Sequence, residues 1–135
     1  RIFLPKMRRR KNRSGIINIS SAIGQFPSPD VGAYSAAKQF VRVFTKTLYL
    51  ENSDKIDVLC VKPVGVLTGM MEFRKNLLLV VLPVQVVRQS LYELGKVPTT
   101  FGAVQHKFLT SQMKAIETER LMGIYNAAFF KARRN

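Results

Sequence analysis

Two short apolar runs separated by one long helical segment constrain the fold of this chain more than any other feature. Residues 15–20 (Gly-Ile-Ile-Asn-Ile-Ser) and 56–61 (Ile-Asp-Val-Leu-Cys-Val) are typical of strands buried on both faces of a parallel sheet. Residues 32–52 contain no proline and no internal glycine, and they predict an α-helix. Its expected apolar face, spaced four, three and four residues apart, consists of Ala37, Val41, Phe44 and Leu48. Strand, helix and strand predict an α/β fold with a right-handed crossover, a mostly parallel sheet and a ligand site beyond the carboxyl ends of the strands.

The other segments add helices around this unit, and residues 1–135 are expected to form one domain or a piece of one. Pro83 is placed to begin a helix that Gly95 ends. Residues from about 108 to 135 predict a basic, amphipathic helical tail. The basic run at 6–13 precedes the first strand, so it lies away from the carboxyl ends of the strands. This position favours a solvated surface over a site for nucleic acid or lipid headgroups.

Charge and cysteine content restrict the classes of partner. Lysine and arginine number 22 against 8 acidic residues, a formal net charge of +14. This charge attracts nucleotide phosphates, coenzyme A, anionic lipid and nucleic acid alike. With one cysteine, Cys60, and one histidine, the sequence offers neither a disulfide framework nor a metal site. Its longest apolar run, 77–84, is far shorter than the roughly 20 residues that a membrane-spanning helix needs.

Three side chains near the predicted strand end could act together in one reaction: Ser21, Tyr34 and Lys38. Tyr34 and Lys38 lie four residues apart, on one face of the predicted helix. An ammonium beside a phenol lowers the phenol's pKa from about 10 toward neutral pH, which suits a general acid. The Ser21 hydroxyl can hydrogen-bond a carbonyl oxygen and polarise it while hydride arrives from the opposite side. We therefore predict a carbonyl-reducing site.

The Tyr-x-x-x-Lys spacing also occurs at Tyr92 and Lys96. Gly95 interrupts that pair at a predicted helix end, and the residue 13 positions before Tyr92 is Leu79 rather than a serine. We interpret the second pair as a coincidence of composition.

Three segments together resemble the second half of the short-chain dehydrogenase/reductase superfamily. They are Gly-Ile-Ile-Asn-Ile-Ser-Ser at 15–21, Tyr-Ser-Ala-Ala-Lys at 34–38 and Pro-Val-Gly-Val-Leu-Thr at 63–68. Phe-Pro-x-Pro at 26–29 and Pro-Val-Gln-Val-Val at 83–87 are most similar to 17β-hydroxysteroid dehydrogenases and very-long-chain 3-oxoacyl-CoA reductases. The resemblance covers about residues 1–110. It implies a Rossmann-type domain of which this chain is the carboxyl-terminal half, with the first strands missing.

The resemblance also implies roles for individual residues. Ser21 would position the substrate carbonyl, Tyr34 would donate the proton, and Lys38 would hold the nicotinamide ribose. The expected cofactor is NADP(H), with NAD(H) not excluded, and no metal. Its expected contacts are Tyr34, Lys38, Pro63, Val64, Gly65, Val66 and Thr68.

The expected function is reduction of a ketone on a lipophilic substrate, a 3-oxoacyl-CoA or a 17-oxosteroid. The chain departs from the family in two ways. It has no glycine-rich dinucleotide turn and no asparagine of the proton relay, and it has Pro63-Val64 where the family has Pro-Gly or Pro-Tyr. The alternative hypothesis is a truncated, noncatalytic remnant that acts as an interaction or membrane-associated module.

Partners and location follow from the resemblance. It implies a homodimer, the cytosolic side of the endoplasmic reticulum membrane and contact with a membrane surface, with no nucleic acid. The basic end 129–135 is similar to tails that retain related enzymes there, and a merely amphipathic end is the competing interpretation. Met70, Met71 and Phe73 are either a mobile cover over an apolar substrate or core residues.

Three further residues have structural interpretations. We expect Asn18 to brace neighbouring backbone and Cys60 to be a small buried side chain. For His106 we expect either a packing or capping role or a contact with substrate. It is not among the predicted catalytic residues.

Overall fold

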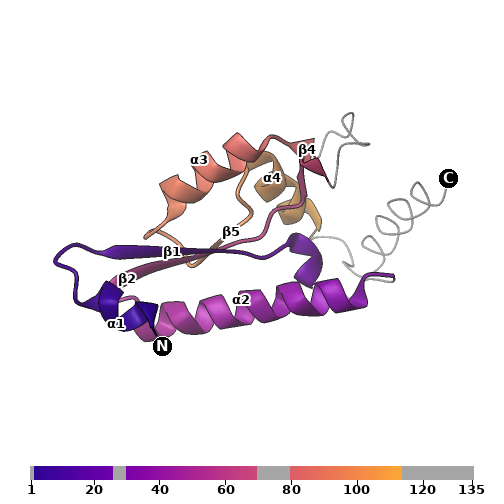
Figure 1. Cartoon of the computed structure of the whole chain (residues 1–135). Coiled ribbons are helices and arrows are strands. Elements are labelled where there is room, and N and C mark those ends of the chain that lie inside the picture. The colour runs from indigo at the N-terminus through magenta and orange to yellow at the C-terminus, as the bar shows by residue number, and fades with distance from the viewer. Residues whose placement is uncertain (1, 26–29, 70–79, 114–135) are drawn as a thin grey trace.

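We describe residues 2–25, 30–69 and 80–113 of a computed structural model of the chain (Figure 1). Its helices and strands are, in order, α1 (Phe3–Arg8), β1 (Ser14–Ile19), the 3₁₀ helix η1 (Ala22–Gln25), α2 (Gly32–Asn52), β2 (Ile56–Val61), β3 (Gly65–Val66), β4 (Val80–Val81), α3 (Pro83–Glu93), β5 (Thr99–Thr100) and α4 (Val104–Met113).

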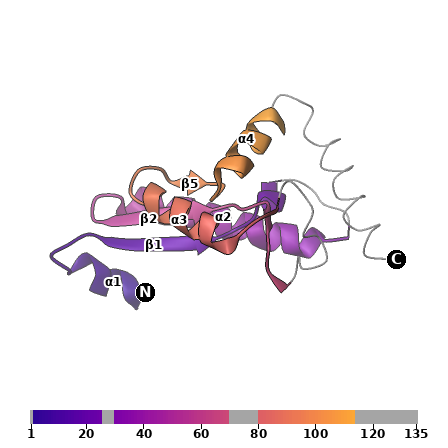
Figure 2. The same ribbon diagram turned by 90° about the horizontal axis from the view of Figure 1, so that it is seen from above.

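The described strands form two parallel sheets. The larger has the order β1-β2-β5, with Ser14 opposite Ile56 and Ile19 opposite Val61, and the smaller pairs β3 with β4. Helix α2 runs along one face of the larger sheet and α3 covers the other (Figure 1), and the three strands lie side by side when seen from above (Figure 2). The predicted α/β arrangement with a parallel sheet is confirmed.

The two long strands differ in burial. Every residue of β2 is buried except Asp57, which confirms the predicted buried strand. Strand β1 is mostly half-buried, and the Ile19 side chain is 52% exposed, so the prediction of burial on both faces is wrong for β1. The physical reason is its position, because β1 pairs only with β2 among the described strands.

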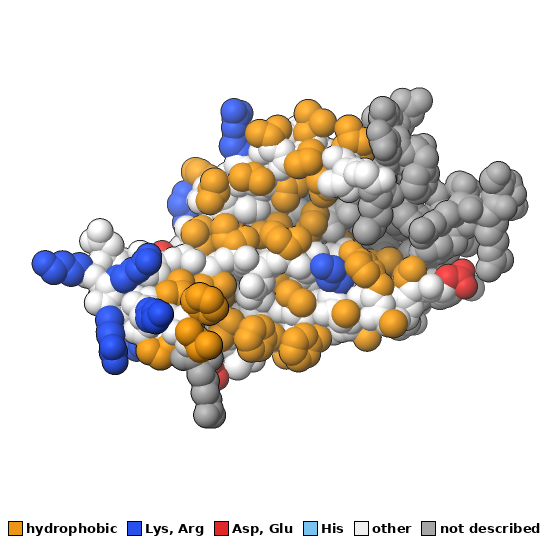
Figure 3. Space-filling view, viewed as in Figure 1, with side chains coloured by type: hydrophobic (Ala, Val, Ile, Leu, Met, Phe, Trp, Pro, Cys, Tyr) orange, Lys and Arg blue, Asp and Glu red, His pale blue; other side chains and the backbone are white. Residues whose placement is uncertain are grey.

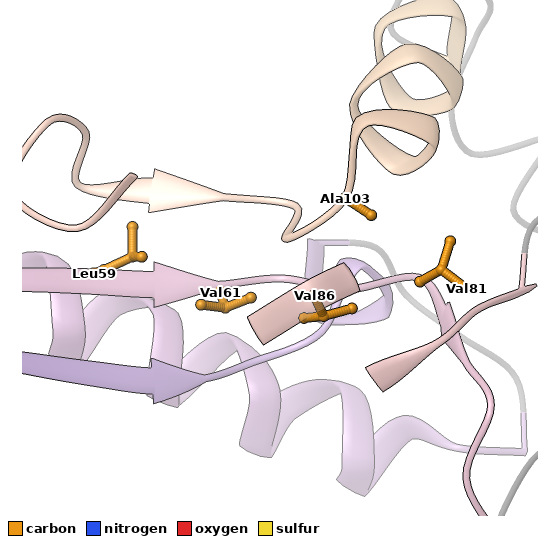
Figure 4. Close-up of a cluster of buried hydrophobic side chains, with 5 residues drawn as sticks. All are labelled: Leu59, Val61, Val81, Val86 and Ala103. Carbon is orange, nitrogen blue, oxygen red and sulfur yellow. The ribbon is translucent and has the colours of Figure 1, made fainter. Parts of the chain in front are cut away.

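The apolar core lies between β2 and α3. Leu59 and Val61 of β2 form one buried cluster with Val86 of α3, Val81 and Ala103 (Figure 4). Burial of such side chains contributes roughly 1.5–3 kcal/mol each to folding. The predicted helix from Pro83 to the residues before Gly95 is confirmed, with the proline in its first turn. Gly95 has φ of 81°, the left-handed conformation that ends helices.

Helix α2 has the predicted bounds, but its expected apolar face is only partly buried. Val41 and Leu48 are half-buried and Ala37 and Phe44 are exposed, while the buried side chains of the helix are polar: Ser35, Thr45 and Asn52. The sheet supplies polar partners, since the Asn18 Nδ2 of β1 donates to Thr45 Oγ1 at 3.0 Å. Asn18 therefore braces a helix side chain, not the neighbouring backbone as expected.

Ion pairs fasten the amino-terminal end of the sheet, where the basic run lies. The Arg8 guanidinium pairs with Asp54 at 2.7 Å, and Arg13 pairs with Asp57 at 2.6 Å. The hydrogen bond from Arg8 lowers the pKa of the Asp54 carboxyl. The strand end that carries Ser21 is at the opposite end of β1.

Helix α4 spans residues 104–113, and the rest of the predicted tail at 108–135 lies outside the described residues, as do Met70, Met71 and Phe73. Within the described ranges, no helix is long and apolar enough to cross a membrane. The same ranges contain no cluster of three or more histidine, cysteine or acidic side chains that could hold a metal ion.

Cys60 is the last residue but one of β2, is fully buried as expected, and has a pKa raised chiefly by that burial. We expect its reaction with a disulfide reagent at pH 8 to be at least about tenfold slower in the native chain than in urea. In the native chain a smaller fraction of Cys60 is thiolate, and the reagent has less access to its sulfur. Thiol release followed by absorbance measures both rates. Equal rates in the two conditions would contradict the buried position.

Candidate active site

The carboxyl ends of β1 and β2 are joined by backbone hydrogen bonds that continue past the strands. Ser20 N–H donates to the Val61 carbonyl at 2.7 Å, and Ala22 N–H donates to the Pro63 carbonyl at 3.0 Å. Ser21 lies between these two bonds and is buried. Its Oγ donates to the Pro63 carbonyl at 3.5 Å and accepts from the Ile23 N–H at 3.3 Å.

The segment after Ser21 packs on the first turns of α2. The Ser20 hydroxyl donates to the Lys38 carbonyl at 2.6 Å, and the Ser35 hydroxyl donates to the Ile23 carbonyl at 2.9 Å. Gly24 makes the approach feasible, since a Cβ there would lie 2.9 Å from Lys38 Cβ and from the Gln39 nitrogen. The strand end and the Tyr34–Lys38 turn of α2 are therefore fastened to each other.

Tyr34 and Lys38 lie on one face of this turn, as predicted. The Lys38 ammonium is 5.5 Å from the centroid of the Tyr34 ring and donates to the Ile19 carbonyl at 3.2 Å. Tyr34 is 42% exposed, so part of the residue is open to solvent. Ser21, Tyr34 and Lys38 thus lie at one end of the sheet, connected by hydrogen bonds of their immediate neighbours.

The residues of the predicted cofactor segment, 63–68, differ in their contacts and burial. Pro63 contacts the Ser21 hydroxyl through its carbonyl, and Val64 is half-buried beside it. Gly65 and Val66 form β3. Thr68 is exposed, and its hydroxyl donates to the Val66 carbonyl at 3.4 Å. Among the contacts of the described residues, none joins Thr68 to the predicted catalytic residues.

The second Tyr-x-x-x-Lys pair shows that spacing alone does not make a site. The Lys96 ammonium lies 3.3 Å from the centroid of the Tyr92 ring, closer than in the first pair. Tyr92 is 67% exposed on α3, and no serine at a strand end accompanies it. Position at the carboxyl end of β1 therefore distinguishes Tyr34 from Tyr92.

Sequence reasoning missed the residues that fasten this site. The Ser20 and Ser35 hydroxyls donate to backbone carbonyls across the contact between α2 and the segment after β1, and Gly24 permits the close approach. The adjacent serines at 20 and 21 were a usable signal, because successive strand residues face opposite sides of a sheet. His106 is fully buried, and its Nδ1 accepts from the Val64 N–H at 3.4 Å, which is a structural contact to the predicted cofactor segment.

The family model described as "short chain dehydrogenase" matches residues 1–77, more than half of the chain. The chain belongs to the short-chain dehydrogenase family. The matched stretch is the amino-terminal part of this chain, so the assignment of residues 1–135 to the carboxyl-terminal half of the family's domain stays a prediction.

Two curated family members are similar over most of the chain. A very-long-chain 3-oxoacyl-CoA reductase of Anas platyrhynchos is 34% identical over 92% of this chain, which covers 40% of the reductase. A 17β-hydroxysteroid dehydrogenase type 3 of Rattus norvegicus is 33% identical over 73% of this chain, which covers 33% of that dehydrogenase. The chain therefore spans well under half the length of either relative.

Solved structures share the Rossmann-like fold of this chain over part of their own length. A structure from a study of 7β-hydroxysteroid dehydrogenase stereoselectivity has a TM-score of 0.72 at 25% identity and covers 86% of this chain and 47% of its own. A short chain dehydrogenase from Salmonella enterica, at 20% identity, has a TM-score of 0.59 over 73% of this chain and 44% of its own, which shows the fold alone.

Proposed function

We propose that this chain carries the proton-donating part of an NAD(P)H-dependent carbonyl reductase site, with Tyr34 as general acid. The observation that carries the proposal is the placement of the Lys38 ammonium beside the Tyr34 ring, at the strand end where Ser21 lies. Similarity to 3-oxoacyl-CoA reductases and a 17β-hydroxysteroid dehydrogenase supports an oxidoreductase of this class.

The described residues fit the nicotinamide end of a dinucleotide. The Lys38 ammonium uses one donor on the Ile19 carbonyl, and its other N–H groups are suited to ribose hydroxyls. The half-buried Pro63, Val64 and Val66 offer a partly apolar wall for the nicotinamide ring. The Tyr34 hydroxyl is a further donor on the same side. The sequence contains no Gly-x-x-x-Gly-x-Gly turn for a pyrophosphate, so the fit covers only this end.

Each residue has a distinct task in this mechanism. A reduced nicotinamide, when bound, supplies hydride to the carbonyl carbon. The Ser21 hydroxyl turns from its long bond to the Pro63 carbonyl and donates to the substrate oxygen. Tyr34 transfers its proton to that oxygen as the alcohol forms. The Lys38 ammonium stabilises the phenolate that remains.

We propose a lipophilic ketone as substrate, a 3-oxoacyl-CoA or a 17-oxosteroid, and NADP(H) as cofactor. The basic net charge of +14 favours phosphorylated ligands such as NADPH and coenzyme A thioesters. The named activities of the similar proteins support the two substrate classes.

We also propose that residues 1–135 form the carboxyl-terminal half of the family's domain. Strand β1 is followed by Ser20 and Ser21 instead of a glycine-rich turn, and it has a free edge among the described strands. A preceding strand of a longer protein would pair with that edge. The endoplasmic reticulum membrane, on its cytosolic side, remains the proposed location.

A homodimer through α2 is a further part of the proposal. The outer face of α2 exposes apolar side chains, and Phe40 and Phe44 stack on it with ring centroids 6.0 Å apart. Apolar groups also gather over α3 and toward the amino terminus, where lysine and arginine side chains surround them (Figure 3). Such mixed apolar and basic surface suits contact with another chain or a membrane surface.

The test is oxidation of NADPH, followed at 340 nm, by the full product of the gene that encodes this chain. The substrates are a 3-oxoacyl-CoA, a 17-oxosteroid and the corresponding alcohols as controls. We expect NADPH oxidation that depends on one of the two ketones. A folded protein that binds NADPH but reduces neither ketone would contradict the substrate proposal.

The same assay separates the enzyme from the noncatalytic remnant. Sequence upstream of Arg1 in the gene that encodes Gly-x-x-x-Gly-x-Gly after a strand supports the enzyme. A folded product that binds neither NADPH nor NADH supports the remnant. Salt-sensitive binding of DNA without nicotinamide binding would favour a nucleic-acid binder.

A further inference from the structure

The peptide between Pro63 and Val64 is held from both sides. On one side the Pro63 carbonyl accepts from the Ala22 N–H at 3.0 Å and from the Ser21 hydroxyl at 3.5 Å. On the other side the Val64 N–H donates to Nδ1 of His106 at 3.4 Å. Both ends of one peptide unit are thereby tied to separate elements, η1 and α4.

The histidine side of this arrangement is rigidly supported. His106 is fully buried near the start of α4. The next residue, Lys107, forms an ion pair with the buried carboxylate of Glu93 on α3, and Gln89 donates to the same carboxylate oxygen at 2.8 Å. Helix α4 is therefore fixed to α3 at the position of the imidazole.

Phe101 connects the histidine to the residue before Pro63. The Lys62 ammonium lies 4.5 Å from the centroid of the Phe101 ring and 3.4 Å from Gln25 Oε1 of η1. Lys62 itself is buried, which makes a cation–π contact stronger than at an exposed site. The Lys62 N–H also donates to the Thr100 carbonyl at 2.7 Å. Residues 62 and 64 are thus both held by the segment from β5 to the first turn of α4.

The imidazole has two competing partners at one nitrogen. His106 Nδ1 lies 3.4 Å from the Val64 nitrogen and 3.4 Å from the Phe101 carbonyl oxygen. A bare Nδ1 accepts from the Val64 N–H, whereas a protonated Nδ1 donates to the Phe101 carbonyl. One nitrogen cannot do both, so the tautomer of His106 decides whether the Val64 N–H has a partner.

We infer that His106 is a positioning residue that holds the Pro63–Val64 peptide through a bare Nδ1. The peptide in turn holds the Ser21 hydroxyl through the Pro63 carbonyl. In this assignment the proton of the neutral imidazole is on Nε2. The consequence for catalysis rests on the proposed function, whereas the positioning of the peptide does not.

Hydrogen exchange at the Val64 amide tests this inference without any activity. His106→Asn places a polar atom near the position of Nδ1, whereas His106→Gln places it near that of Nε2 and removes the acceptor from Val64. We expect the Val64 amide to exchange at least about tenfold faster in H106Q than in the parent, and H106N to restore most of the protection. The amides of Val58 and Leu59 in β2 are the controls for global opening.

Two results would overturn the inference. One is a Val64 amide that exchanges at the same rate in H106Q as in the parent. The other is equal loss of protection at Val64, Val58 and Leu59 in both variants, which assigns His106 to general packing. If either variant fails to fold, the ¹⁵N chemical shifts of His106 in the parent chain decide, because a protonated Nδ1 contradicts the assignment.

Failure of this inference is distinct from failure of the proposed function. Protection of Val64 can depend on His106 in a protein that reduces no ketone, and the exchange experiment detects this. In an active protein, we expect H106Q to lower kcat for the ketone and H106N to recover part of it.

Discussion

Tyr34→Phe is expected to lower kcat for ketone reduction by the full-length protein about 10²- to 10⁴-fold, the usual contribution of a general acid. The variant removes only the phenolic hydroxyl. The Tyr34 side chain is 42% exposed, so loss of its one oxygen should leave the buried packing of α2 unchanged. Binding of NADPH, measured by its fluorescence, should weaken much less than kcat falls, because Lys38 and residues 63–68 keep the other proposed contacts to the cofactor.

Tyr92→Phe is the matched control for this prediction. Tyr92 also has a lysine ammonium over its ring, from Lys96, and it is also exposed on a helix. Its distance from the strand end that carries Ser21 predicts full activity for Y92F. Equal loss of kcat in Y34F and Y92F, or full activity in Y34F, would remove Tyr34 from the mechanism.

Gly102→Ala is expected to lower the free energy of unfolding by about 2–4 kcal/mol, from unfavourable φ and from overpacking. Gly102 has φ of 71°, a conformation that residues with a Cβ rarely adopt. An added Cβ would also lie 2.8 Å from Val86 Cγ1 and 2.9 Å from Val61 Cγ1, both in the core cluster. Urea unfolding followed by circular dichroism measures the change.

The control for Gly102 is Gly32→Ala at the start of α2. A Cβ at Gly32 would have no neighbouring atom within 4 Å, and no left-handed backbone angle occurs there. We therefore expect G32A to be neutral or to stabilise the chain by up to about 1 kcal/mol through helix propensity. A G102A variant as stable as G32A would show that the turn from β5 to α4 tolerates rearrangement.

The sequence predicted the features whose signals are local. Helix α2 and strand β2 have the expected positions, because proline and glycine distribution and β-branched runs act within the segment itself. The face of α2 was predicted only in part, with Val41 and Leu48 half-buried but Ala37 and Phe44 exposed, because its burial depends on a non-local partner. Asn18 of β1 supplies a hydrogen bond to Thr45, which buries a polar face and leaves Phe44 outside.

The residue types of the candidate site were predictable from the sequence, but the contacts that hold those residues in place were not. The spacing of Ser21, Tyr34 and Lys38 identified the set, and the structure places all three at one end of the sheet. The contact between His106 and Val64 joins residues 42 positions apart, which no periodic pattern reveals. The roles of Ser21, Tyr34 and Lys38 in catalysis stay predictions.

The adjacent serines after β1 make the site sensitive to the pairing register of its two strands. The Ser20 hydroxyl faces α2 and the Ser21 hydroxyl faces the Pro63 carbonyl. Sliding β1 by a single residue against β2 would exchange these directions, since neighbouring strand residues face opposite sides. The arginine–aspartate pairs at the far end of the strands oppose such a slip. Insertion of one residue within β1, with the far end of the strand held by these pairs, would therefore put the Ser20 hydroxyl where the Ser21 hydroxyl lies, even though both serines remained in the chain.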